Sequence, residues 1–526
     1  MTEHSPARAA VGMGVVTAVS RSFGFLRVLV IAAVLGATYL GNTFQASNSV
    51  SNVLFELLAA GALSAVLVPT FVELLDAGRA DEAERLANGL LGIALLVLGA
   101  VVVLGYATAP LVARALSSGA PNSSVAAHQR ALSTFLLWFF VPQVLLYAFG
   151  AVATALLYAR RRFAITAAAP IGNTVVMVGA LLVFRTVAGA SPGLHLSLGE
   201  KLLLALAGTG GVVAFVGLLV LAARSSGFRL RPRIARGDPA VNRLLRMSGW
   251  GVLLHAIAGA LLGAALVLGN GVEGGVVAYQ TAFVFFLAPY ATLAQPVHTA
   301  ILPELANEAG RGDLDAFARS VRWALDSIAG FVVPVSAAMV ALAYPVMRVV
   351  AFGAIHGSAV SLLAAGLASL ALGLYGYGAF LLLARSYYAL GDSRTPAMVA
   401  IAAAVIGVGT MFATAPFAHG SARVAVLGIG HSVAYAFGAV VLGIGLSRRI
   451  GVAIVPTGLL RTTGISAVVA TGAWLVTRWI VPTGRATQLA ELSLVTVAGG
   501  ALYVGAMRVL GNPLRISGRR EEIPLP

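Results

Sequence analysis

The chain has 526 residues, of which 59% are hydrophobic and only 10% are charged. A soluble domain carries about 25% charged residues, so the composition excludes an ordinary soluble enzyme or binding module and indicates a membrane protein. Cysteine is absent, which excludes disulfides and thiolate metal sites.

Apolar runs of roughly 20 residues recur along the whole chain, long enough to cross about 30 Å of hydrocarbon as helices. The runs are long and do not alternate with period two, which favours helices over a β-barrel. We therefore expect an all-α polytopic membrane protein with about 14 transmembrane helices. The predicted spans are 11–36, 44–72, 87–113, 131–158, 163–187, 200–223, 243–269, 274–303, 326–351, 359–385, 395–417, 421–447, 457–481 and 487–510.

The net charge of +16 follows the predicted topology rather than forming a nucleic-acid surface. With the N-terminus in the cytoplasm, most basic residues fall in cytoplasmic connections, which is the positive-inside bias. The sequence thus predicts cytoplasmic N- and C-termini, contacts with anionic membrane lipids and no nucleic-acid partner. The connection between spans six and seven alone contains Arg224, Arg229, Arg231, Arg233, Arg236, Arg243 and Arg246.

A weak internal repeat divides the chain. The segment from Asp76 to Asp81 resembles the segment from Glu308 to Asp313 at an offset of 232 residues, and Tyr158 corresponds to Tyr388 at an offset of 230. These pairs predict a duplicated six-helix unit, with an N-lobe at 1–235, a C-lobe at 236–450 and two further spans with a tail at 451–526. Because six is even, the copies are expected to run parallel around a central cavity, as in alternating-access transporters.

Two arginines interrupt the first predicted span. Arg21 is expected about 15 Å and Arg27 about 24 Å from the cytoplasmic edge, and the two side chains should point about 120° apart. A central arginine costs roughly 2.5–3.5 kcal/mol on insertion scales. We therefore expect a carboxylate partner or an anionic ligand in a wet cavity, although outward snorkelling of Arg27 is a structural alternative.

The second span carries one acid and a polar face. Glu56 is the expected partner of an arginine of span one, with proton relay as an alternative role. Asn48, Asn52 and Glu56 share one helical face with Ser51, and Asn42 belongs to the polar patch at the start of the span. We interpret this patch as cavity lining, and helix–helix hydrogen bonding is an equally weighted alternative.

No catalytic or metal-binding motif is apparent. His255 and His298 stand alone without a ligand pattern, and the chain has no P-loop, no G-x-S-x-G and no paired inward carboxylates. The sequence therefore predicts a transporter that is not an enzyme, with no cofactor and no metal.

Five segments, in order and spacing, resemble the MurJ/MviN family of lipid II flippases, within the oligosaccharide-lipid and multidrug exporter superfamily. They are "SRSFGFLRVLVIAAVLG", "NVLFELLAAGALSAVLVPTF", "RRRFAITAAAPIGNTV", "AILPELANEAGRGDLDAF" and "RSYYALGDSRTPAMVAI", and the resemblance covers roughly 12–450.

This resemblance implies flipping of a polyprenyl-diphosphate-linked peptidoglycan precursor across the bacterial plasma membrane. It also implies that Arg21 and Arg27 line the cavity and hold the diphosphate, which suits the bidentate, permanently charged guanidinium. The predicted substrate-binding set is Arg21, Arg27, Asn42, Asn48, Asn52 and Glu56. The expected partners are lipid II or a similar polyprenyl-diphosphate glycolipid, membrane lipids and proteins of cell-wall synthesis.

The chain also departs from the family pattern. It has Asn42 where many members have Asp, Phe55-Glu56 where many have an arginine pair, and no charge in the "TAFVFFLAPY" segment of span eight. The acidic sodium ligands of some members have no evident counterpart, so the coupling ion is open. The alternatives are an exporter of another polyprenyl-linked saccharide or an amphiphilic drug, and a non-transporting cell-wall scaffold.

Overall fold

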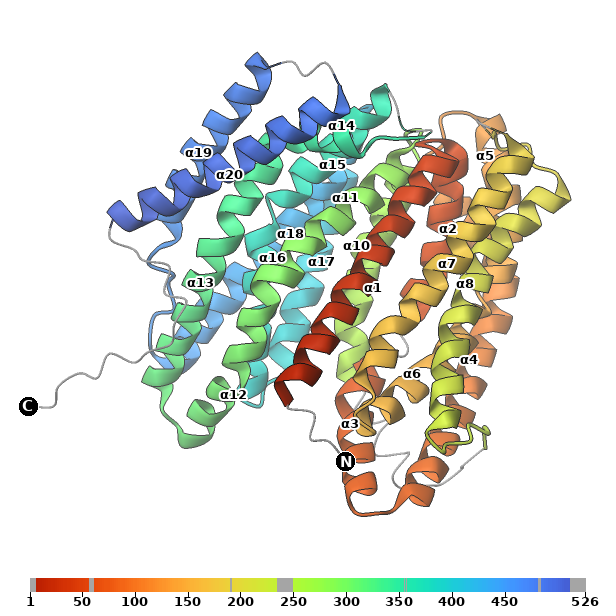
Figure 1. The fold of residues 1–526 in the computed structure, drawn as a ribbon, viewed down its shortest axis with the longest axis horizontal. Helices are drawn as coiled ribbons and strands as arrows, with labels where there is room; N and C mark the ends of the chain where they lie inside the picture. The colour runs from red at the N-terminus through yellow and green to blue at the C-terminus, as the bar shows by residue number, and fades with distance from the viewer. Residues whose placement is uncertain are drawn as a thin grey trace, which may run out of the picture. The chain divides into compact units, whose positions relative to one another are not determined.

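The computed structural model describes residues 6–55, 61–189, 192–233, 249–353, 355, 357–480 and 484–510, without the side chains of 6–15, 17, 55, 61–66 and 249–258. Within these residues every regular element is helical (Figure 1). The predicted all-α fold is confirmed.

The helices agree with the predicted spans. Eleven helices in the described part are long and apolar enough to cross a membrane, and the bent pair α15 (Ser358–Ala371) and α16 (Leu374–Ala389) makes a twelfth. The two remaining predicted spans, 44–72 and 243–269, include residues outside the described part. Both contain helix on the residues that are described, in α2, α3 and α10.

Two compact units divide the chain. Unit 1 comprises Met1–Thr281, Ala351–Leu362 and Met411–Val424, and unit 2 comprises Ala282–Val350, Leu363–Thr410 and Ala425–Pro526. The predicted lobe boundary at 235–236 lies among residues outside the described part and stays a prediction, as does the separation of 451–526.

Unit 1 is built on the first helices of the chain. They are α1 (Pro6–Leu35), α2 (Tyr39–Phe55), α3 (Gly61–Asp76), α4 (Ala80–Leu116), α5 (Ser123–Phe140), α6 (Gln143–Ala159), α7 (Phe163–Ala188), α8 (Leu198–Ser225) and α10 (Gly249–Gly269), with the first half of α11 (Gly275–Pro289). Figure 1 shows α1, α7 and α8 side by side, and α7 packs against both neighbours.

One apolar cluster fixes the end of α1 in unit 1. Leu35, Phe44, Phe140 and Phe184, from α1, α2, α5 and α7, are fully or almost fully buried in it. Phe44 and Phe140 meet edge to face, with ring centroids 5.9 Å apart. Each large buried side chain stabilises by roughly 1.5–3 kcal/mol, so the C-terminal end of α1 is firmly anchored.

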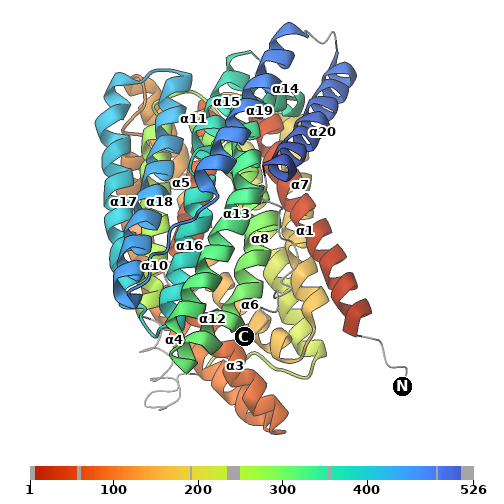
Figure 2. The ribbon, with the colours of Figure 1, turned by 90° about the vertical axis from the view of Figure 1, so that its left-hand side faces the viewer.

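Unit 2 contains η2 (Tyr290–Ala294), α12 (Gln295–Arg311), α13 (Leu314–Ala341), α14 (Ala343–Val350), α16, α19 (Leu459–Trp479), α20 (Arg485–Val509) and most of α15, α17 (Arg394–Thr414) and α18 (Ser421–Ile450). Figure 2 shows α19 and α20 side by side. The Tyr503 hydroxyl of α20 donates to the Gly330 carbonyl of α13 at 2.8 Å. This bond ties the last helix of the described residues to the rest of unit 2.

The turns reproduce the internal repeat in backbone geometry. After α6, Arg161 has φ 57° and Arg162 N–H donates to the Leu157 carbonyl; after α16, Gly391 has φ 75° and Asp392 N–H donates to the Tyr387 carbonyl. Both are helix-ending Schellman turns, and they match at the predicted offset of 230.

The other repeat pair matches with a small shift. Left-handed Gly78 ends α3 and left-handed Gly312 ends α12. The equivalent turn residues are therefore 234 positions apart rather than the 232 that the sequence alignment predicts, and the next helices, α4 and α13, also start 234 residues apart. The duplication thus extends to the way corresponding helices end.

Candidate functional site

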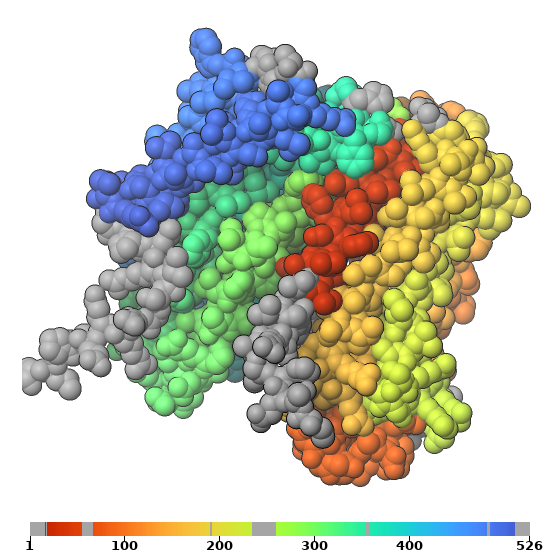
Figure 3. Space-filling view, viewed as in Figure 1, coloured from red at the N-terminus to blue at the C-terminus, as the bar shows by residue number. Residues whose placement is uncertain are grey.

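The two arginines of α1 have different surroundings in unit 1. Arg21 is exposed and Arg27 is partly buried, which agrees with side chains that point in different directions around the helix. In the space-filling view α1 (red) forms part of the surface beside α7 (Figure 3). Among the described residues no carboxylate forms an ion pair with either arginine.

A polar cluster links Arg27 to two other helices. The Tyr147 hydroxyl of α6 donates to Asn52 Oδ1 of α2 at 2.9 Å, and Tyr147 lies close enough to Arg27 for an electrostatic interaction. Asn52 itself is exposed. Three helices of unit 1 therefore bring a guanidinium, a phenol and an amide together at the edge of its packed core, where an anion could accept hydrogen bonds.

Ser51, on the same face of α2 as Asn52, belongs to a buried hydrogen-bond network and not to this cluster. Ser51 Oγ donates to Gln143 Oε1 at 3.0 Å, and Gln143 Nε2 donates to Thr209 Oγ1 of α8 at 3.0 Å. Ser51 and Gln143 are fully buried. This chain of hydrogen bonds holds α2, α6 and α8 together, which is the helix–helix role that the sequence left as the alternative.

Asn42 also has a structural role. Its side chain is fully buried, Nδ2 donates to the Val272 carbonyl at 2.8 Å, and Oδ1 accepts from the Val276 and Val277 N–H groups. All three partners lie in unit 1 at the turn between α10 and α11. The amide oxygen is saturated by backbone donors, so we leave Asn42 out of the candidate site.

Asn48 is partly buried and faces α8. A Cβ added at Gly208 would come 3.2 Å from Asn48 Oδ1 and 2.4 Å from the Phe140 ring. Glycine at 208 thus makes room for both side chains. Glu56, the predicted partner of the arginines, lies outside the described residues.

No metal site emerges in the described part of the chain, where no group of three or more His, Asp or Glu side chains could hold an ion. His298 is fully buried in unit 2, and the side chain of His255 is outside the described set. The donor chemistry at Arg27, Tyr147 and Asn52 suits an anion rather than a cation.

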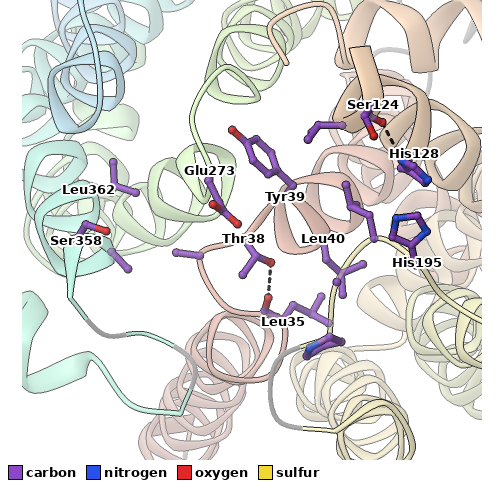
Figure 4. A pocket seen from close by; sticks show the side chains of 16 residues that line it. Leu35, Thr38, Tyr39, Leu40, Ser124, His128, His195, Glu273, Ser358 and Leu362 are labelled. Atoms are coloured by element: carbon purple, nitrogen blue, oxygen red, sulfur yellow. Dashed lines mark hydrogen bonds between the residues drawn. The ribbon is translucent and has the colours of Figure 1, made fainter. Parts of the chain in front are cut away.

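Unit 1 also contains a hollow that the sequence did not indicate (Figure 4). It has a volume of about 610 Å³ and lies where α1 meets α2, lined in part by Leu35, Thr38 and Tyr39. His128 and His195 meet in it with ring centroids 4.0 Å apart, and His128 Nδ1 lies 2.8 Å from the Ser124 carbonyl. Glu273 and Ser358 are further polar lining residues.

Sequence reasoning missed Tyr147 and Gln143, which are the hydrogen-bond partners of Asn52 and Ser51. Both lie in the apolar fourth span, 95 and 92 residues from their partners Asn52 and Ser51. The one available signal was the presence of an amide directly after Pro142 inside an otherwise apolar run.

The matching family model and the similar sequence relatives indicate the same protein family. The family model for the lipid II flippase MurJ matches residues 31–495, a range that starts after both arginines. A probable lipid II flippase MurJ of Rhizobium tropici is 28% identical over 402 residues, which cover 75% of this chain and 73% of the relative.

Two solved structures share the fold. A lipid II flippase MurJ in an inward closed conformation aligns with a TM-score of 0.75 at 16% identity, over 95% of this chain and 99% of the other. An inward-facing multidrug resistance MATE family transporter of the MOP superfamily aligns with a TM-score of 0.65 at 13% identity, over 82% and 94%. At these identities the structures support the fold alone.

Proposed function

Because the chain belongs to the lipid II flippase MurJ family, we propose that it moves the polyprenyl-diphosphate-linked peptidoglycan precursor from the cytoplasmic to the outer leaflet of the bacterial inner membrane. The surroundings of Arg27 are the observation that supports this function most directly. Arg27 is partly buried in a membrane helix and lies close to Tyr147, without an ion pair to any described carboxylate.

An anionic headgroup would offset the cost of that charge. A diphosphate accepts several charge-assisted hydrogen bonds, and guanidinium can supply two of them in parallel. In our proposal Arg27 binds the diphosphate directly, Tyr147 and Asn52 position it, and the exposed Arg21 attracts it. Asn48 and Glu56 remain proposed members of the site.

We further propose that the chain works by alternating access, with both termini in the cytoplasm. Under this orientation the hollow at Tyr39 and His128 opens toward the outer side, because it lies at the C-terminal end of α1. Leu35 is about 12 Å along the helix from Arg27. The substrate would bind near the arginines and leave on the side of the hollow.

Rescue of bacteria depleted of their own lipid II flippase tests this function. The wild-type chain should restore growth and cell shape, whereas Arg27→Ala should not, at equal membrane abundance. Arg85→Ala serves as the matched control, because Arg85 is an exposed arginine at the start of α4.

Failure of the wild-type chain despite normal expression would reject the lipid II assignment. It would favour export of another polyprenyl-linked saccharide or an amphiphilic drug. Full rescue by Arg27→Ala would reject the assigned site while leaving the function in place.

A further inference from the structure

A buried histidine of unit 2 lies next to a change in helix geometry. Between α11 and α12 the chain forms the π-helix η2, Tyr290–Ala294, and His298 follows four residues later. The His298 side chain has no exposed surface. Single π-turns inside longer helices are often found at functional sites.

The imidazole of His298 has polar groups of two other helical elements close to it, the Tyr290 hydroxyl and the Gly378 backbone. Nδ1 lies 3.4 Å from the Tyr290 hydroxyl, while Nε2 has no hydrogen bond in the described part of the chain. The backbone of Gly378 in α16 supplies a polar group close to the ring. Tyr290 also packs edge to face on Tyr377, with ring centroids 4.7 Å apart.

One cation lies close to this pair. Arg385 of α16 interacts electrostatically with His298, with Tyr290 and with Tyr388. Tyr388 is 41% exposed, so the row of polar groups leads from the buried ring to the surface of unit 2. From η2 the facing titratable group is Tyr290 and from α16 it is Arg385. No ionisable side chain of α13 in the described chain interacts with the ring.

We propose that His298 is a proton-binding site through which flipping is coupled to protons. With Nδ1 accepting from Tyr290, the neutral ring carries its hydrogen on Nε2. An added proton therefore goes to Nδ1, which then donates, and the Tyr290 hydroxyl must turn to accept. This reversal acts directly on η2, where the helix already departs from regular geometry.

Arg385 connects the proton to an anion. A positive guanidinium opposes a second positive charge on His298, and an anionic substrate group near Arg385 would reduce this opposition. By linkage, anion binding favours proton uptake and proton uptake favours anion binding. This coupling rests on the proposed function, whereas proton binding by His298 does not.

A proteoliposome assay with lipid II tests the coupling. The wild-type flipping rate should change at least about threefold when a pH gradient is imposed, and His298→Gln should abolish that response while retaining basal flipping. His431→Gln is the matched control, because His431 is similarly buried but its Nδ1 lies 3.1 Å from the Leu427 carbonyl of its own helix. A wild type indifferent to the gradient, or a His298→Gln variant that still responds, would overturn the proposal.

Proton binding is measured separately in detergent, where flipping plays no part. On acidification from pH 8 to 3 the His298→Gln protein should take up one proton fewer than the wild type in a potentiometric titration, and equal uptake overturns the proposal. His298→Asn replaces His298→Gln if the latter does not fold.

Arg385→Gln should move the pH midpoint of flipping upward, because a repelling charge is removed. Absence of lipid II flipping in the wild type would count against the proposed function, and the titration would still decide the proton site.

Discussion

Arg27 is the residue on which the account depends. A charged group inside hydrocarbon persists only with a partner or a wet, functional environment, and Tyr147 is the group that the structure places near it. Arg21 is exposed, and in our proposal its positive charge attracts the substrate.

Replacement of Tyr147 tests whether its hydroxyl helps to position the substrate at Arg27. We expect Tyr147→Phe to lower the lipid II flipping rate about threefold to tenfold, because the ring remains while the hydroxyl that meets Asn52 is lost. Thermal stability should change by less than about 1 kcal/mol, since the exposed Asn52 can turn to water.

The measurement is flipping in proteoliposomes beside thermal unfolding in detergent. Tyr106→Phe, at an exposed tyrosine of α4, is the control and should behave as wild type. Unchanged flipping in Tyr147→Phe would remove Tyr147 from the site.

Individual polar residues of α2 could not be assigned from sequence. The periodicity placed Asn48, Ser51 and Asn52 on one face, and Ser51 and Asn52 do both meet α6. Ser51 nevertheless joins a buried network and Asn52 a partly exposed cluster, because Gln143 and Tyr147 lie one turn apart on α6. Asn42 differs again, since its partner Val272 is 230 residues away. Periodicity gives the face of a helix but not the partner that covers it.

At the scale of elements, the "ALGDSRTP" segment joins two helices of unit 2 through hydrogen bonds of Asp392. Asp392 Oδ1 accepts from Thr395 N–H at 2.9 Å, Oδ2 accepts from Thr395 Oγ1 at 2.8 Å, and the carboxylate pairs with Arg449 at the end of α18. Within unit 2, this one acid caps α17 and ties it to α18.

Replacement of Asp392 should therefore weaken unit 2. We expect Asp392→Ala to lower the free energy of unfolding by about 1–2 kcal/mol at pH 7, in the range of a lost helix cap. Asp392→Asn should lose less, because an amide oxygen still caps the helix while the ion pair is gone. Thermal unfolding in detergent measures both.

The stability difference between the wild type and Asp392→Ala should depend on pH in a direction that follows from the pKa of Asp392. Burial opposes ionisation of Asp392, but the hydrogen bonds from Thr395 and Arg449 outweigh it and hold the pKa of the carboxyl below its usual value. A lowered pKa in the folded state stabilises above the unfolded-state pKa of about 3.9. The gap between wild type and Asp392→Ala should be constant from pH 7 to 5 and shrink below about pH 4. A gap that grows on acidification would contradict this role.

At the scale of the whole molecule, hydropathy was sufficient to predict the fold class. Each span needs about 20 apolar residues, a local property, and all fourteen predicted segments contain helix in the described chain. The repeat was also visible, although Gly312 rather than Gly310 holds the left-handed turn that corresponds to Gly78. Contacts between helices distant in the chain were not predictable, since they depend on how each helix is rotated about its axis and on how its side chains pack.

In our proposal this chain flips lipid II, Arg27 binds its diphosphate and Arg21 attracts it. The most direct measurement is translocation of lipid II in proteoliposomes by the wild type, Arg27→Ala, Arg27→Lys and Arg21→Ala, with Arg85→Ala as the control. Loss of a charge-assisted interaction of about 1.5–3 kcal/mol corresponds to roughly tenfold to a hundredfold. We predict that loss for Arg27→Ala, a smaller one for Arg27→Lys and Arg21→Ala, and wild-type flipping for Arg85→Ala. Wild-type rates in folded Arg27→Ala and Arg21→Ala alike would contradict the account.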